Sequence, residues 1–239
     1  MSTVTDEAAP EVILGTTRHP SVYIYEAPVR LWHWLNAACI VVLAVTGYLI
    51  GSPPPSLAGD AGGVFRFGAL RFAHFAAGLL FAGGFVFRAY WAFVGNHYAR
   101  QLFVLPFWRA VWWREIWFEL SWYLFLRKEP KKYLGHNPLA HFMMFFLFTL
   151  VGLFMIVSGM ALYAEGQGPG SWTRGLFGWV FWLFPNTQDL RTLHHLGLWV
   201  MVCFTMLHVY AAIREDIMSR QSMLSTMISG RRMFKDDRP

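Results

Sequence analysis

The stretch from Arg191 to His208 constrains the fold most, because it is a long apolar run with histidines near both of its ends. His194 and His208 are 14 residues apart. On an α-helix this separation returns a side chain to within about 40° of its starting face and moves it about 21 Å along the axis. His195 would point to a different face, about 140° from His208. A bilayer hydrocarbon core is roughly 30 Å thick. One membrane helix would therefore present two imidazoles on one face, one near each surface, and each would need a partner from another helix.

The composition places the chain among integral membrane proteins. Of its 239 residues, 56% are hydrophobic and only 14% are charged, whereas soluble domains are about 25% charged. Apolar runs predict four spans, at about residues 29–50, 68–94, 139–163 and 191–213. Residues 102–125 are rich in Trp and Phe, but Pro106 and several charges at roughly helical spacing interrupt them. This pattern favours a helix lying in the membrane interface over a further span. The expected fold is an all-α, four-transmembrane-helix bundle with an interfacial amphipathic helix between spans two and three.

The positions of Lys and Arg predict the orientation. Loop 96–138 and the C-terminal tail hold most of the basic residues, whereas loops 51–67 and 164–190 hold few. Basic loops stay in the cytoplasm, so both termini and the long loop are expected there. The expected organisation is a mostly irregular N-terminal tail (1–27), a transmembrane domain (28–214) and a C-terminal tail (215–239). The first 25 residues lack the pattern of a cleaved signal peptide. Lipids are expected partners, and nucleic acid is not.

Four histidines fall at matched depths in this topology. His74 and His194 lie near the outer surface, and His33 and His208 lie near the cytoplasmic surface. Two bis-imidazole sites stacked across a bilayer are what two b-type haems require. A single histidine at a helix end would fit a polar interfacial residue equally well, whereas four at matched depths favour ligands. The two cysteines form no Cys-x-x-Cys pair, so covalent c-type attachment is unsupported.

Several arginines are candidates for binding the haem propionates. An arginine three residues before a histidine shares its helical face, and a guanidinium can bind a carboxylate with two hydrogen bonds. Snorkelling to lipid headgroups is the alternative. A further arginine lies 14 residues after His74, and Gly47 lies 14 residues after His33. That glycine would leave room for a macrocycle, or would only allow close helix packing. The four candidates are Arg30, Arg71, Arg88 and Arg191.

Two stretches resemble the signatures of a known family. Arg30-Leu-Trp-His-Trp34 running on to Thr46-Gly47, and Arg191-Thr-Leu-His-His195 running through Trp199 to His208, resemble the cytochrome b subunit of membrane-bound nickel–iron uptake hydrogenases. Residues 25–29, 135–139 and 212–216 are also similar, and the similarity covers about residues 22–235. The spacing of His194 and His208 is similar to that in the γ subunit of membrane formate dehydrogenases, which share the four-helix, two-haem plan.

The resemblance implies a function. The four paired histidines would ligate the irons of two haems b, in a multi-pass protein of the bacterial cytoplasmic (inner) membrane. The small and large subunits of a periplasmic-facing nickel–iron hydrogenase would be the partners. The chain would carry electrons from their iron–sulfur clusters to the membrane quinone pool, without a hydrogen-activating site of its own. The alternative within this class is the γ subunit of another periplasmic oxidoreductase, such as formate dehydrogenase.

The resemblance also implies a quinone site near the inner haem. His136 and Asn137 precede the third span at the cytoplasmic face. In the related formate dehydrogenase subunit an asparagine of the equivalent loop lies at the quinone site. Alternatively, Asn137 only precedes Pro138 and caps the third span.

Two other classes fit less well. A membrane non-haem iron oxygenase needs clustered His-x-x-His-His boxes, whereas these histidines are spread singly. An anchor without a cofactor would leave four imidazoles in the membrane unexplained.

Overall fold

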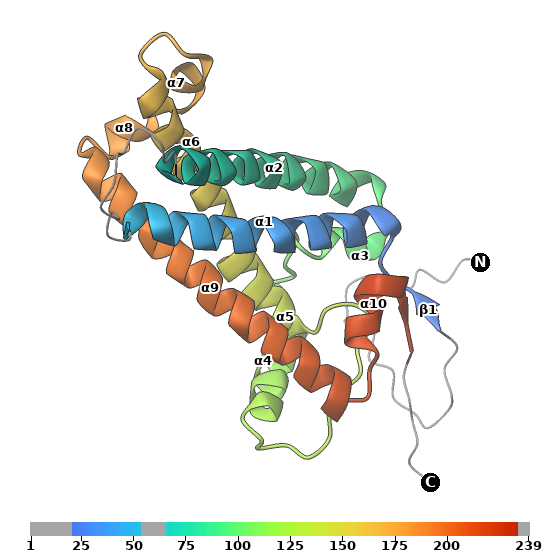
Figure 1. Ribbon diagram of the computed structural model, residues 1–239. Helices are drawn as coiled ribbons and strands as arrows, with labels where there is room; N and C mark the ends of the chain where they lie inside the picture. Colours follow the sequence, from blue (N-terminus) through green and yellow to red (C-terminus); the bar gives the residue numbers. More distant parts are fainter. Residues whose placement is uncertain (1–20, 54–65, 234–239) are drawn as a thin grey trace. The chain divides into compact units, whose positions relative to one another are not determined.

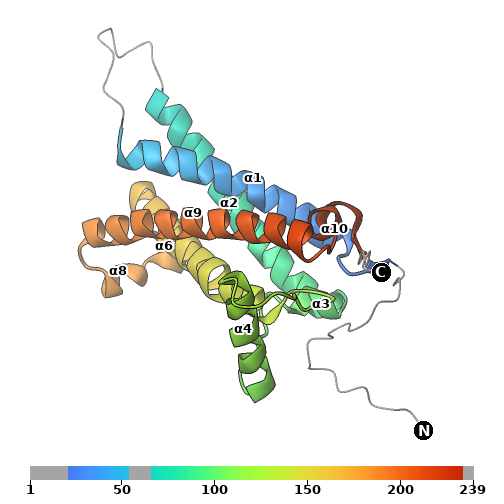
Figure 2. The same cartoon turned by 90° about the horizontal axis from the view of Figure 1, so that it is seen from below.

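The structure is a computed structural model that describes residues 21–53 and 66–233. Among these residues, four helical segments are long and apolar enough to cross a membrane (Figure 1 and Figure 2). They are Ala27–Gly51 (α1), Arg66–Val94 (α2), Pro138–Gln167 and Thr187–Met218 (α9). The shortest has 25 residues, about 38 Å at 1.5 Å per residue, which exceeds a hydrocarbon core of roughly 30 Å. The prediction of a helical membrane protein with four spans is confirmed.

The third of these segments is not a uniform α-helix. It begins as α5 (Pro138–Met143), continues as a π-helical segment at Met144–Leu150 (η2) and ends as α6 (Val151–Gln167). A run of seven consecutive π-helical residues is uncommon. π-Helix usually occurs as single-turn bulges inside α-helices, often at functional sites. The hydropathy of this stretch predicts a span but carries no signal for the change in helix type.

Short elements lie between the spans. They are α3 (His97–Arg100), α4 (Ala110–Tyr123), α7 (Trp172–Phe177) and α8 (Val180–Leu183). α4 falls inside the stretch where the sequence predicts an amphipathic helix. Its buried residues are spaced three or four apart, as on one helical face: Trp112, Ile116, Glu119 and Trp122.

The described parts of the two termini pair with each other. Val22–Tyr23 (β1) and Arg231–Arg232 (β2) form an antiparallel ladder, in which Val22 lies opposite Arg232. A further helix, α10 (Met223–Ser229), leads into β2. The sequence predicts a mostly irregular N-terminal tail and a charged C-terminal tail, and gives no indication of this ladder or of α10. Strands of two residues are too short to produce an alternating hydrophobic pattern. Most of the predicted N-terminal tail and of loop 51–67 lies outside the described residues.

The chain divides into two compact units. The described residues of unit 1 are 21–31, 89–149 and 206–233, and those of unit 2 are 32–53, 66–88 and 150–205. In unit 1, Ile24, Tyr25 and Leu134 form one buried apolar cluster, and α4 packs against α5. In unit 2, Ala161 and Leu190 belong to a second cluster, and α7 packs against α6 (Figure 1).

Candidate haem-binding site

Unit 2 brings together the two histidines that the sequence pairs near the outer surface. His74 of α2 and His194 of α9 have ring centroids 6.4 Å apart, with an interplanar angle of 74°. Two imidazoles that bind one metal ion from opposite sides, with metal–nitrogen bonds of about 2 Å, have centroids about 6 Å apart. The separation of these two rings therefore fits a bis-imidazole haem site.

Each of these rings contacts a hydroxyl group. Thr46 Oγ1 lies 2.9 Å from His74 Nδ1, and Ser158 Oγ lies 2.7 Å from His194 Nδ1. Both hydroxyls also donate a hydrogen bond of 2.6 Å to the backbone carbonyl four residues earlier in their own helix. Both hydroxyl groups are buried, with Thr46 6% and Ser158 1% exposed. These contacts are not predicted from the sequence, although a hydroxyl residue followed by glycine occurs at both places.

The glycine that follows each hydroxyl residue leaves space for the histidine ring that this hydroxyl contacts. A Cβ atom added at Gly47 would lie 3.2 Å from Cε1 of His74, and one added at Gly159 would lie 3.2 Å from Cε1 of His194. Contacts this short are tighter than most Cβ contacts, so side chains here would push against the rings. Gly47 therefore leaves room at His74, one of the two histidines that the sequence predicts near the outer surface.

A cavity of about 930 Å³ opens beside the two histidines. This volume lies within the roughly 300–1,000 Å³ that is usual for cofactor sites. Its walls come from unit 2 and include Arg71 and Arg191, two of the propionate candidates. Arg191 also forms an ion pair of 2.8 Å with Glu165, another wall residue. The donor set, the cavity and the glycines fit haem b.

His195 lines the same cavity. Its ring packs against Gly51 at the end of α1 and lies edge-on to Trp199, with centroids 6.3 Å apart. From its position on the helix, His195 is predicted to point away from the site. The structure instead places a third imidazole at the cavity wall, with contacts that differ from those of His74 and His194.

The other predicted ligands lie in different units. His33 belongs to unit 2 and lies edge-on to Trp34, with ring centroids 5.1 Å apart, whereas His208 belongs to unit 1. The pairing of His33 with His208 stays a prediction from the sequence.

Arg88 is 3% exposed in unit 2, and its guanidinium lies 5.4 Å from the centroid of the Trp32 ring. A cation so deep in a membrane helix is costly unless it is compensated.

The remaining arginine candidate lies in unit 1. Arg30 donates a hydrogen bond to the backbone carbonyl of Ile228 in α10. This contact links the start of the first span to the C-terminal segment, a contact that the sequence does not predict.

The two quinone candidates also lie in unit 1, and both have protein partners. The side chain of Asn137 is 4% exposed and accepts a 2.6 Å hydrogen bond from the backbone N–H of Ala140, capping α5. His136 lies 3.3 Å from the Tyr25 hydroxyl and 3.2 Å from Oε1 of Gln101. The capping role that the sequence allows for Asn137 is therefore present in the structure.

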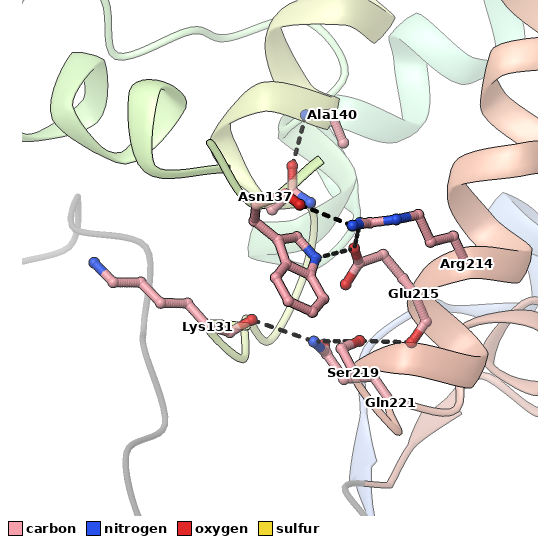
Figure 3. A network of polar contacts seen from close by, with 8 residues as sticks. Lys131, Asn137, Ala140, Arg214, Glu215, Ser219 and Gln221 are labelled. Atoms are coloured by element: carbon pink, nitrogen blue, oxygen red, sulfur yellow. Dashed lines mark hydrogen bonds and ion pairs between the residues drawn. The ribbon is translucent and has the colours of Figure 1, made fainter. Parts of the chain in front are cut away.

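A buried polar network lies next to Asn137. Figure 3 shows Arg214 and Glu215 of α9 pointing toward the segment that carries Asn137. Trp122 of α4 donates its indole N–H to Glu215 at 2.9 Å, and Arg214 donates to the Trp122 carbonyl at 2.8 Å. Gln221 donates to the backbone carbonyl of Lys131 at 3.3 Å.

An acidic group lies on the same face of α4. Glu119 is 1% exposed, and burial, together with the nearby Glu215 carboxylate, raises its pKa to about 8. Burial also raises the pKa of Tyr133, whose hydroxyl donates to Glu115 at 2.9 Å. This cluster was not predicted from the sequence. The spacing of Glu115, Glu119 and Trp122 on one helical face is the signal that could have indicated it.

Comparisons with known proteins identify similar chains. Residues 24–230 match the family model described as prokaryotic cytochrome b561. The chain is 59% identical over 216 residues to a probable Ni/Fe-hydrogenase B-type cytochrome subunit of Rhizobium leguminosarum bv. viciae, a match that covers 90% of each chain. It is 60% identical over 222 residues to the protein of the same name in Azotobacter chroococcum mcd 1, covering 93% of this chain and 92% of the relative. It is 46% identical over 217 residues to the probable Ni/Fe-hydrogenase 1 B-type cytochrome subunit of Escherichia coli (strain K12), covering 90% and 92%.

Proposed function

Because the chain belongs to the prokaryotic cytochrome b561 family, with b-type haem as its cofactor, we propose that it is the membrane cytochrome subunit of a nickel–iron hydrogenase. It carries electrons from that enzyme to quinone through two haems b. The names of its relatives support the hydrogenase partner. The single observation that carries the haem assignment is the pair His74 and His194, whose Nδ1 atoms both contact hydroxyl groups.

The chain's own residues hold and orient the cofactors. When bound, haem b supplies an iron that accepts and donates one electron at a time. His74 and His194 bind the outer haem, and His33 and His208 bind the inner one. The nearby guanidinium groups neutralise the propionates: Arg71 and Arg191 at the outer haem, and Arg30 and Arg88 at the inner haem. Arg191 would share its charge between a propionate and Glu165.

Electrons and protons balance across the complex. Oxidation of one H₂ by the small and large hydrogenase subunits on the periplasmic side releases two electrons and two protons. The two electrons cross the membrane one at a time and reduce one quinone, which takes up two protons to become a quinol. Quinone reacts near His136 and Asn137, and the protons come from the cytoplasmic side. This arrangement has both termini and the loop between α2 and α5 in the cytoplasm, in a bacterial inner-membrane protein.

Haem content of single variants tests the ligand assignment. The purified full-length protein is expected to hold two haems b per chain, measured as the pyridine haemochrome. His74→Ala or His194→Ala should remove one haem, the same one in both variants. His33→Ala or His208→Ala should remove the other, and His195→Ala should keep both. Two haems in His194→Ala together with loss of one in His195→Ala would refute the assignment.

A donor assay tests the partner. The alternative is the cytochrome b subunit of another periplasmic oxidoreductase, such as formate dehydrogenase. In membranes that contain the native complex, H₂ should reduce the haems of this chain and formate should not. Reduction by formate but not by H₂ would favour the alternative.

A further inference from the structure

The hydroxyl groups of Thr46 and Ser158 can each donate only one hydrogen bond. Each lies 2.6 Å from a backbone carbonyl oxygen, of Val42 and of Phe154 respectively. A carbonyl oxygen only accepts, so the hydroxyl proton must point to it. The second contact of each hydroxyl, with the Nδ1 atom of a histidine, then requires an N–H on that ring as the donor.

This chain of donors determines the tautomer of both rings. A neutral imidazole carries one N–H, and the hydroxyl oxygen requires it at Nδ1. The lone pair of Nε2 is then free to bind a metal ion, as a haem ligand needs. Two helices, α1 and α6, provide the same arrangement for histidines of two other helices, α2 and α9.

We propose that Thr46 and Ser158 are positioning residues that set the tautomer, the rotation and the donor strength of the two histidines that would hold one haem. The proposal rests on the assignment of His74 and His194 as ligands. A group that accepts a hydrogen bond from the Nδ1 proton makes the ligating imidazole more basic. A more basic ligand favours the ferric iron, so the two hydroxyls lower the reduction potential of this haem.

The test uses isosteric removal of each hydroxyl in the full-length, haem-loaded protein. Thr46→Val and Ser158→Ala should shift the midpoint potential of one haem upward and leave the other unchanged. The affinity of each variant for that haem, measured by transfer of the haem to apomyoglobin, should fall by about 10–100-fold. A loss of this size is usual when a group that hydrogen-bonds a metal ligand is removed. Thr46→Ser keeps a hydroxyl, so its midpoint potential and its haem affinity should equal those of the wild type.

Thr205 provides a matched control. Its hydroxyl donates to the carbonyl of Met201 at 2.8 Å, in the same back-bonded geometry, and it does not line the cavity. Thr205→Val should change neither potential nor affinity. If Thr46→Val and Ser158→Ala also leave both unchanged, the proposal is wrong. Loss of both haems in Thr46→Val would likewise contradict it, since this would indicate a role in folding.

The histidine variants separate this proposal from the function on which it rests. If His74→Ala removes one haem while Thr46→Val has no effect, the ligand assignment stands and the positioning role fails. If His74→Ala keeps both haems, the ligand assignment itself fails, and the positioning role fails with it.

Discussion

Trp122 donates its indole N–H to the carboxylate of Glu215 over 2.9 Å, so α4 is joined to the C-terminal part of α9. Arg214 strengthens the connection, because its guanidinium donates to the Trp122 carbonyl at 2.8 Å and lies 4.7 Å from the centroid of the Trp122 ring. All three side chains are buried, none more than 5% exposed. Buried charged groups are tolerated when they are paired and hydrogen-bonded. α4 and the end of the fourth span are therefore expected to stay on one side of the membrane.

The first prediction concerns this topology. α4 has 14 residues, about 21 Å of helix, which is shorter than a hydrocarbon core of roughly 30 Å. A topology reporter fused after Lys131 should read cytoplasmic, and one fused at the C-terminus should read the same. The control is a fusion after Gly170, in the loop between α6 and α7, which should read periplasmic. A periplasmic signal after Lys131 would overturn the four-span orientation.

The second prediction concerns pH and the buried carboxyl of Glu119. Its pKa is raised from 4.5 to about 8, first by burial and then by Glu215. Between these two pH values the folded state holds one proton more than the unfolded chain, so the free energy of unfolding falls as pH rises through this window. Below the window the contribution is fully present, and above it the contribution is lost.

Thermal unfolding of the detergent-purified protein between pH 5 and pH 9 measures this effect. The midpoint temperature should decrease with pH in the wild type and decrease less in Glu119→Gln, which cannot ionise. Glu129→Gln is the control, because Glu129 is an exposed carboxyl of the same segment. Parallel pH profiles in the wild type and Glu119→Gln would show that Glu119 is not the titrating group.

The third prediction separates the two roles of Asn137. Its Oδ1 atom caps α5 by accepting a hydrogen bond from the backbone N–H of Ala140. Serine is an equally good N-cap, whereas alanine is not and costs about 1 kcal/mol. If the amide binds quinone, Asn137→Ser and Asn137→Ala should both keep two haems that H₂ reduces, and both should fail to pass electrons to quinone. Normal quinone turnover in Asn137→Ser would leave only the capping role.

The spans and the outer histidine pair could be predicted because a bilayer imposes a length and a depth on every helix. The alternating direction of the spans was enough to pair His74 with His194, since it places both at the same expected depth, and their rings lie 6.4 Å apart in the structure. The hydroxyl partners could not be predicted. Thr46 and Thr205 look alike in an apolar run, and only packing decides which of them meets a ring. The strand pairing of the termini was missed because it joins residues about 200 positions apart through a two-residue ladder.

The polar network of unit 1 was missed for a different reason. A charged, aromatic-rich stretch such as 102–125 predicts a helix with one face in contact with lipid headgroups. The structure instead buries Glu119 and Trp122 of that helix, and Trp122 donates its indole N–H to Glu215. Whether charges on an amphipathic helix face water or one another depends on the segment that covers them, which here comes from the far end of the chain.

The last prediction concerns the space beside the two outer histidines. Gly47→Ala would place a methyl group 3.2 Å from Cε1 of His74, and Gly159→Ala would do the same at His194. Each ring must then turn away from its hydroxyl partner or push the helices apart, and overpacking of this kind typically costs about 1–3 kcal/mol. Both variants should lose the outer haem, or bind it with an altered low-spin spectrum, and keep the inner one. Gly83→Ala is the control, because nothing lies within 4 Å of a Cβ atom added there. If Gly47→Ala and Gly159→Ala both bind two haems with unchanged spectra, haem binding does not require the space that these glycines leave beside the rings.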